Sequence, residues 1–139
     1  IENIMRETKI DPKNILIEVT EEIQIKKTNK VKKTLLQLKK IGIGLIALDD
    51  FGTGYSSFSN LISYPIDIVK IDKFFIDKLE SKKYSIITSA LVPLIKKYGL
   101  QVVAEGVETE RQFELLKDMG CDYFQGYYFF KPQRDVVIQ

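Results

Sequence analysis

Apolar residues along this chain fall into short runs that alternate with stretches of helical periodicity. The runs predict strands at residues 14–20, 44–49, 66–71, 100–104 and 122–129. Between them, helical spacing predicts helices at 31–41, within 52–64, after Ser81 and after Thr109. Strands that are apolar on both faces and alternate with helices are typical of parallel sheets connected by right-handed crossovers. Because no linker or low-complexity tract interrupts this pattern, we expect one α/β domain over residues 1–139.

Local signals mark the ends of the last two predicted helices. Thr109 and Gln112 form a capping box, and the helix that follows should end at Gly120 with Phe113 and Leu116 facing inward. The longer helix should begin at a Ser81 cap and stop at Gly99. Its apolar side is predicted to consist of Tyr84, Ile87, Leu91, Leu94, Ile95 and Tyr98.

A charged or amide side chain stands at or near the carboxyl end of every predicted strand. The residues are Glu18, the pair Asp49 and Asp50, Lys70, Glu105 and Gln125. The carboxyl ends of parallel strands meet at one rim, which is where open α/β sheets and closed barrels bind ligands. We therefore expect these side chains to form one site.

Composition narrows the chemistry of that site. The chain has no histidine, which excludes Ser-His-Asp and Cys-His catalysis and histidine-ligated zinc or haem within it. Its single Cys121 cannot form an internal disulfide, which is compatible with a reducing cytoplasm. Lysine and arginine number 21 against 19 acidic residues, so the net charge of +2 gives no sign of a nucleic-acid polymer as partner.

Adjacent carboxylates such as Asp49 and Asp50 repel each other unless a cation neutralises them. Ligands that are all oxygen suit magnesium, manganese or calcium. Lys70 in the same site would stabilise a phosphate or a developing anion. The residues 52–54, Gly-Thr-Gly, could bring backbone amides close to a phosphate, although a structural turn is the safer interpretation of these glycines. The residues favour metal-assisted phosphoryl chemistry.

Five segments taken in order resemble the EAL domain, the family of cyclic di-GMP phosphodiesterases. They are Ile17-Glu-Val-Thr-Glu21, Leu48-Asp-Asp-Phe-Gly-Thr-Gly-Tyr-Ser-Ser57, Val69-Lys-Ile-Asp72, Val103-Ala-Glu-Gly-Val-Glu-Thr109 and Gln125-Gly-Tyr followed by Pro132. The resemblance covers nearly the whole chain but only the later portion of the family's domain. It implies the C-terminal part of a TIM-like (β/α)8 barrel, with about five of the eight strands.

The resemblance also implies an activity: hydrolysis of cyclic di-GMP to linear pGpG with two magnesium or manganese ions. By motif, Glu18 resembles a ligand of the first metal, Asp49 the ligand shared by both, and Asp50 with Glu105 ligands of the second. Lys70 resembles the residue that orients the attacking water or the phosphate.

Further roles rest on the same resemblance. Gln125 resembles a glutamine near the water and the substrate, and Glu108 belongs to the loop on the substrate side. Glu21 resembles the acid that anchors the loop 50–57, which contains Gly52, Thr53 and Gly54 and is linked in the family to dimer contacts. The family also implies upstream sensory domains and a cytoplasmic location, which is compatible with a parent protein anchored to a membrane through upstream segments.

The sequence departs from the family in lacking the Glu-Ala-Leu motif and the asparagine on the next strand. Both resemble ligands of the first metal, so we expect this chain alone to be weakly active or inactive. An incomplete barrel would leave two sheet edges open, and we expect a second copy or the rest of the barrel to cover them.

Two other interpretations stay open at this stage. A non-catalytic EAL module could bind cyclic di-GMP or another protein without cleaving anything. A phosphoacceptor receiver domain has similar length and also uses an acid pair and a lysine on magnesium. Its acid pair should close the first strand, however, whereas here the pair closes the second and Lys70 lies in the third.

Overall fold

The computed structural model describes residues 2–20, 28–52 and 58–132, and these residues form alternating strands and helices. Two short elements come first, α1 (Glu2–Thr8) and the 3-10 helix η1 (Pro12–Asn14). The strands are β1 (Leu16–Thr20), β2 (Leu45–Phe51), β3 (Ile68–Ile71), β4 (Gln101–Glu105) and β5 (Tyr123–Gln125). The helices between them are α3 (Thr28–Lys40), α4 (Phe58–Ser63), α5 (Lys73–Ile76), α6 (Lys82–Lys97) and α7 (Glu110–Met119).

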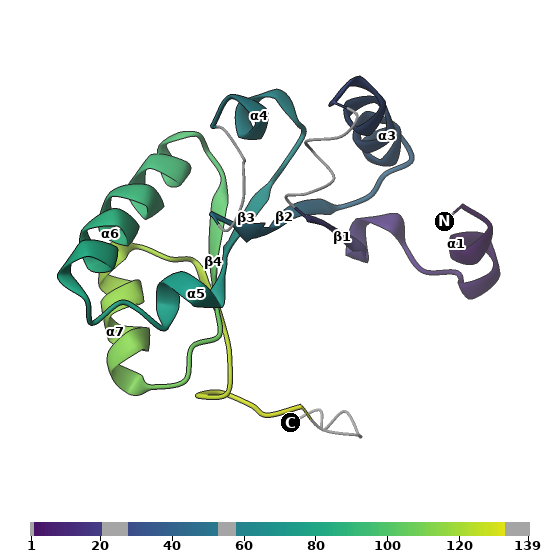
Figure 1. Ribbon diagram of the computed structural model, residues 1–139. Helices are drawn as coiled ribbons and strands as arrows, with labels where there is room; N and C mark the ends of the chain where they lie inside the picture. The colour runs from purple at the N-terminus through teal and green to yellow at the C-terminus, as the bar shows by residue number, and fades with distance from the viewer. Residues whose placement is uncertain (1, 21–27, 53–57, 133–139) are drawn as a thin grey trace.

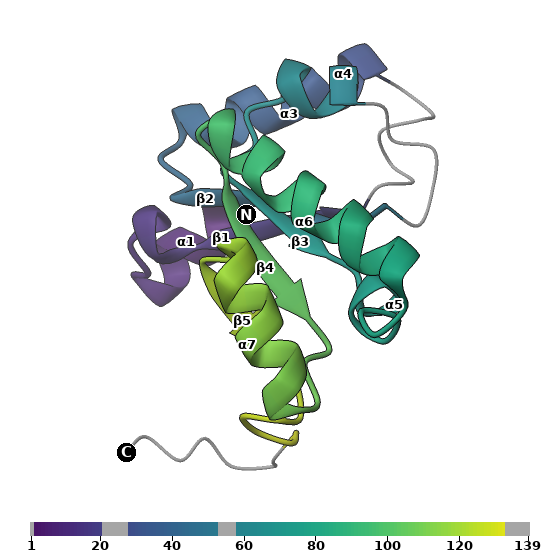
Figure 2. The same ribbon diagram turned by 90° about the vertical axis from the view of Figure 1, so that its left-hand side faces the viewer.

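All five strands are parallel and lie in sequence order, β1-β2-β3-β4-β5. Helices α3, α4, α6 and α7 follow the sheet in an arc along one of its faces (Figure 1). Viewed from the side, α6 lies across β3 and β4 (Figure 2). We call the face opposite these helices the inner face. A curved parallel sheet with its helices on one side is the arrangement found in (β/α)8 barrels, and it differs from an open sheet covered on both faces.

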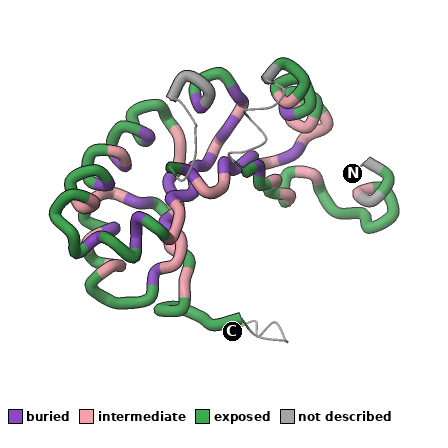
Figure 3. Tube along the Cα trace, in the orientation of Figure 1, coloured by how far each residue is buried: buried purple, intermediate pink, exposed green. Residues whose placement is uncertain are grey.

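The core lies between the sheet and the helices, and the buried positions follow the strands (Figure 3). Side chains alternate between the two faces along a strand. The helix-facing positions of the three central strands are almost completely buried, and they are Ile46, Leu48, Val69, Ile71, Val102 and Ala104. Leu16, Leu45 and Tyr123, on the inner face, are 42%, 38% and 50% exposed. The inner face is therefore open at these three positions, whereas Ala47 and Ile68 on the same face are buried.

Two aspartates fasten the amino ends of the strands. Asp67, just before β3, accepts hydrogen bonds from the Ile46 N–H (2.7 Å) and from Lys39 Nζ (2.6 Å). Asp122, just before β5, accepts from the Val102 N–H (2.8 Å) and pairs with Lys96. In each case the aspartate joins its own strand to the neighbouring strand and to a lysine near the end of a helix. These contacts connect the strands to one another and to the helices at the amino ends of the strands, opposite the carboxyl ends.

The predicted capping box is confirmed at the start of α7. The Thr109 hydroxyl accepts from the Gln112 N–H, and the Gln112 side chain accepts from the Thr109 N–H. Gly120 ends the helix in the left-handed conformation, with φ of 94°, as its position predicted. Ser81 does occupy the N-cap position of α6, but its side chain makes no capping hydrogen bond.

The structure corrects two sequence predictions and adds one helix. The last strand is three residues long, Tyr123–Gln125, and not the whole of 122–129. The short helix α5 follows β3 without having been predicted. On α6, the predicted inward residues Ile87, Leu94 and Tyr98 are 40%, 41% and 50% exposed, whereas Thr88 and Val92 are buried with Ile95. Because α6 carries apolar residues on more than one side, periodicity alone assigned the wrong face.

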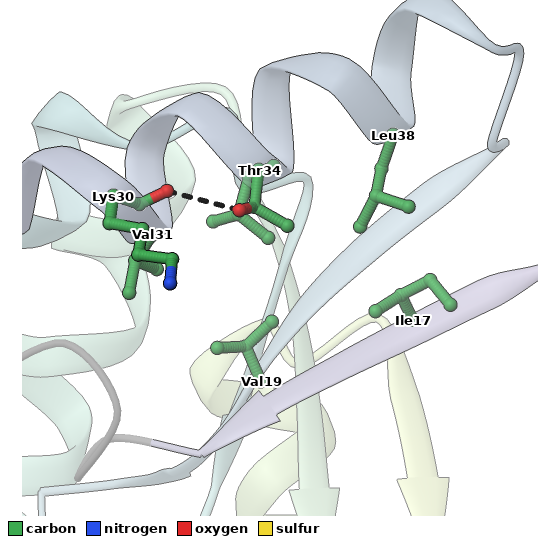
Figure 4. Close-up of a pocket in the computed structure, with 7 residues that line it drawn as sticks. Ile17, Val19, Lys30, Val31, Thr34 and Leu38 are labelled. Carbon is green, nitrogen blue, oxygen red and sulfur yellow. Dashed lines mark hydrogen bonds between the residues drawn. The ribbon is translucent and has the colours of Figure 1, made fainter. Parts of the chain in front are cut away.

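An apolar groove lies between β1 and α3, where Ile17 and Val19 face Val31 and Leu38 (Figure 4). Because side chains alternate along β1, Glu18 points to the inner face, away from this groove. The groove is therefore separate from the polar residues at the carboxyl ends of the strands.

The described part of the chain contains no helix with the length and apolar character that a membrane span needs.

Candidate functional site

The strand register determines which polar side chains share a face. Residues paired across parallel strands lie on the same face, as do residues two apart along one strand. Followed from β1 to β5, the register places five side chains on the inner face: Glu18, Asp49, Lys70, Glu105 and Gln125. All five lie toward the carboxyl ends of their strands, as the sequence predicted.

Lys70 is the centre of the site. Its Nζ lies 2.8 Å from a carboxylate oxygen of each of three residues on three strands: Glu18, Asp49 and Glu105. The Lys70 side chain is 8% exposed. Burial of the ammonium lowers its pKa, but the contacts with Asp49, Glu105 and Glu18 outweigh burial and raise the pKa of Lys70 above its ordinary value. Lys70 is therefore a fixed positive charge at neutral pH.

A β-bulge brings the second acid of the pair into the site. Successive residues of a regular strand point to opposite faces, so Asp50 should point away from Asp49. The register between β2 and β3 shifts between Leu48 and Phe51, and Asp50 takes a left-handed conformation with φ of 57°. As a result, Asp49, Asp50 and Glu105 each offer a carboxylate oxygen, and these oxygens lie within 4.8 Å of one another.

The electrostatics of the cluster favour additional positive charge. Desolvation raises the pKa of Asp50, and repulsion by Asp49 and Asp72 raises it further. Desolvation also raises the pKa of Glu105, although Lys70 opposes this. Asp49 Oδ1 is buried and, apart from the ion pair with Lys70, meets no hydrogen-bond donor among the residues that the structure describes. These acids fit a divalent cation, which prefers carboxylate oxygens and would lower their mutual repulsion.

Asp72 is a member of the site that the sequence analysis did not select. It caps α5 by accepting a hydrogen bond from the Phe74 N–H at 2.7 Å, and its carboxylate also lies against Asp50. The available signal was its position, two residues after Lys70 and directly after the third apolar run. Capping alone would explain an aspartate at that position, and its contact with Asp50 depends on the bulge in β2.

The remaining predicted residues lie at the border of the site or outside the described residues. Gln125 ends β5 beside Glu105 and is exposed. The Glu108 carboxylate binds Lys73 Nζ at 2.8 Å on the surface. Gly52 has φ of 98°, and a Cβ there would lie 2.6 Å from the Phe75 ring, so its role as a structural turn is supported. Glu21, Thr53 and Gly54 lie outside the described residues.

A family model described as the EAL domain matches residues 1–132. This chain belongs to the EAL domain family. It is 41% identical over 133 residues to the signaling protein YkoW of Bacillus subtilis and 38% identical over 133 residues to the bifunctional diguanylate cyclase/cyclic di-GMP phosphodiesterase MucR of Pseudomonas aeruginosa. Each match covers 95% of this chain, but it covers only 16% of YkoW and 19% of MucR.

Solved structures of EAL proteins share the fold. The PaMucR phosphodiesterase, solved as a complex with c-di-GMP, has a TM-score of 0.88 and 38% identity, over 94% of this chain and 53% of that one. Klebsiella pneumoniae BlrP1, solved as a manganese/cy-diGMP complex, has a TM-score of 0.83 and 33% identity, over 91% of this chain and 32% of that one. The predicted fold class is confirmed: five parallel strands with their helices correspond to part of an EAL barrel.

Proposed function

We propose that this EAL chain supplies one part of the active site of a cyclic di-GMP phosphodiesterase. The observation that carries the proposal is the convergence of Asp49, Asp50 and Glu105 within 4.8 Å beside the buried ammonium of Lys70. The c-di-GMP complexes of the related PaMucR and BlrP1 support the identity of the substrate.

The proposed cofactor is a pair of magnesium or manganese ions. Glu18 and Asp49 would hold the first ion, and Asp49, Asp50 and Glu105 the second; the manganese complex of BlrP1 supports this class of metal. Two bound divalent ions acidify water and stabilise the attacking and leaving oxygens of a phosphodiester. Lys70 would orient the phosphate with its fixed positive charge.

Other residues would act on the substrate side. Gln125, exposed at the end of β5 next to Glu105, would contact the substrate or the water. Glu108 would belong to the substrate loop through its place on the surface after β4. The segment with Gly52, Thr53 and Gly54 would line the phosphate, with Glu21 anchoring it.

We expect the chain of residues 1–139 by itself to cleave cyclic di-GMP weakly or not at all. Its sequence contains no Glu-Ala-Leu segment. By the family resemblance, that segment would supply a ligand of the first metal. The first ion would therefore be held by Glu18 and Asp49 alone, and Glu18 is the most exposed of the three carboxylates on Lys70. Binding of cyclic di-GMP without cleavage is the second candidate function, favoured by this incomplete ligand set.

The test is hydrolysis of cyclic di-GMP with magnesium or manganese, followed by chromatography of pGpG. It compares the chain with a version extended upstream, each with its Asp49→Asn variant. Asp118→Asn is the matched control, because Asp118 is exposed on α7, away from the strand ends. Cleavage by the extended protein that Asp49→Asn abolishes and Asp118→Asn retains supports the phosphodiesterase. Binding without cleavage supports the receptor, and no binding contradicts both.

The inner face also suggests a partner. Leu16, Leu45 and Tyr123 are exposed on it, and β1 has no neighbour on its outer edge among the described residues. We propose that a second copy of the chain or the rest of an EAL barrel covers this surface. Light scattering after gel filtration tests this on the isolated chain: a strict monomer that does not bind a hydrophobic dye contradicts it.

The upstream sensory domains and the cytoplasmic location stay predictions.

A further inference from the structure

A surface lysine outside the proposed metal site joins the segment that follows Asp72 to the segment that follows Glu105. Lys73 Nζ binds Asp77, the C-cap of α5, at 2.7 Å and Glu108, in the turn after β4, at 2.8 Å. Its stem lies directly over the backbone of Gly106, where a Cβ would come within 2.7 Å of the Cβ and Cδ atoms of Lys73. Lys73 thus touches the β4–α7 turn with both its stem and its charge.

Each end of this contact is one residue away from an acid of the site. Lys73 follows Asp72, whose carboxylate lies against Asp50. Gly106 follows Glu105, whose carboxylate lies 2.8 Å from Lys70 Nζ. The absence of a side chain at Gly106, which has φ of 71°, lets α5 approach β4 closely. Beyond the last β3–β4 pair, Ile71 with Ala104, the contact between Lys73 and Gly106 therefore continues the link between the segment of Asp72 and the segment of Glu105.

We propose that Lys73 is a positioning residue, which holds Glu105 at the distance from Asp50 that a divalent cation requires. The inference rests on the proposed function for the identity of the bound ion. The ion pairs of Lys73 with Asp77 and Glu108 are exposed, and such pairs contribute little to the stability of the fold. The Gln112 side chain donates to the Ile76 carbonyl at 3.3 Å and joins α5 to α7 independently. Variants of Lys73 should consequently fold.

Charge and geometry predict opposite changes in metal affinity, and this makes the proposal testable. Loss of the positive charge of Lys73 would by itself strengthen the binding of a cation nearby. Loss of positioning would weaken it, and residues that orient metal ligands change affinity by about 10- to 100-fold. The measurement is Mn²⁺ titration of the 139-residue chain, followed by electron paramagnetic resonance of the free ion.

The variants are Lys73→Met, Lys73→Ala and Lys73→Arg, with Lys78→Met as the matched control. Lys78 lies just after α5 and its ammonium sits 3.5 Å from the centre of the Phe74 ring, so its loss removes one nearby charge without touching the β4–α7 turn. We expect Mn²⁺ to bind about tenfold more weakly to Lys73→Met and Lys73→Ala. Lys73→Arg should recover most of the affinity, and Lys78→Met should bind as tightly as the wild type or slightly more tightly. Unchanged or tighter binding by Lys73→Met overturns the proposal.

A second measurement separates this inference from the proposed function. If the wild-type chain fails to bind Mn²⁺, the metal-site proposal fails for this chain, and a double-mutant cycle then decides the role of Lys73. Lys73→Met and Glu105→Gln are made singly and together, and the midpoints of urea unfolding are compared. Positioning of Glu105 by Lys73 predicts that the two shifts are not additive. Additive shifts would leave Lys73 as an ordinary surface lysine.

Discussion

Replacing Lys70 with methionine should destabilise the fold through charge and hardly at all through packing. Methionine keeps most of the length of the lysine stem, so the change removes chiefly the ammonium that lies 2.8 Å from three carboxylates. Removing one partner of a buried ion pair costs about 3–5 kcal/mol. Glu18, with a side chain 46% exposed, adds at most about 1 kcal/mol, whereas Asp49 and Glu105 are only 20% and 16% exposed. We expect a loss of about 3 kcal/mol at pH 7 in the presence of a chelator.

The assay is urea unfolding followed by circular dichroism, for the wild type, Lys70→Met and the exposed control Lys97→Met. Lys70 opposes the desolvation that raises the pKa of Glu105, so without Lys70 the pKa of Glu105 should rise further in the folded variant. Protonation then restores stability to the variant, and its deficit should shrink as the pH falls from 7 toward 4. Mn²⁺ should likewise stabilise the variant more than the wild type, because the ion replaces the missing charge. A loss below about 1 kcal/mol, or a loss that is the same at pH 4.5 and pH 7.5, would refute this reasoning.

Three further predictions concern single residues. Thr109→Ala should lower the free energy of unfolding by about 1 kcal/mol, since it removes one half of the capping box with Gln112; Thr109→Ser should lose much less in the same urea assay. Gly52→Ala should cost about 1–3 kcal/mol, because an alanine there is strained at φ of 98° and meets the ring of Phe75; a stability equal to wild type would contradict the turn geometry. In a chelator, Asp50→Asn should raise stability at pH 7, because the raised pKa of Asp50 means that its ionised form is unfavourable in the folded state. That gain should grow as pH rises from 3.8 through the raised pKa and disappear at lower pH, while Mn²⁺ affinity should fall at every pH; a pH-independent gain would assign it to packing.

Most of the site could be predicted from the sequence because parallel strands with short connections leave few arrangements. Once five apolar runs are accepted as parallel strands, their carboxyl ends must share a rim, and the position of Glu105 or Lys70 within its run is sufficient to place it there. Caps are also local, so the Thr109 capping box and the Gly120 stop depend on a few neighbouring residues only.

The parts that could not be predicted depend on tertiary contacts. The bulge that turns Asp50 into the site appears only when β2 is paired with β3. Thr88 is polar yet fully buried, because its hydroxyl donates to the Tyr84 carbonyl at 2.9 Å; it lies on the buried side of α6, whereas Leu94 is exposed. Helix α5 is one turn long, so no periodicity could reveal it.

The balance of charge explains why a stable fold keeps such an unfavourable cluster. Among the described residues, Glu18, Asp49 and Glu105 contact the ammonium of Lys70, and the carboxylates of Asp50 and Asp72 lie beside them. Together they leave four formal negative charges, and the raised pKa values of Asp50 and Glu105 are the cost of this excess. Asp50 adds a small backbone cost, since the left-handed conformation is less favourable than the right-handed one even for aspartate, which tolerates it better than most residues. A glycine at position 50 would relieve both the repulsion at Asp50 and its unfavourable backbone conformation. Two divalent cations carry four positive charges, so the cluster that destabilises the isolated chain has the charge that the proposed two-metal site needs.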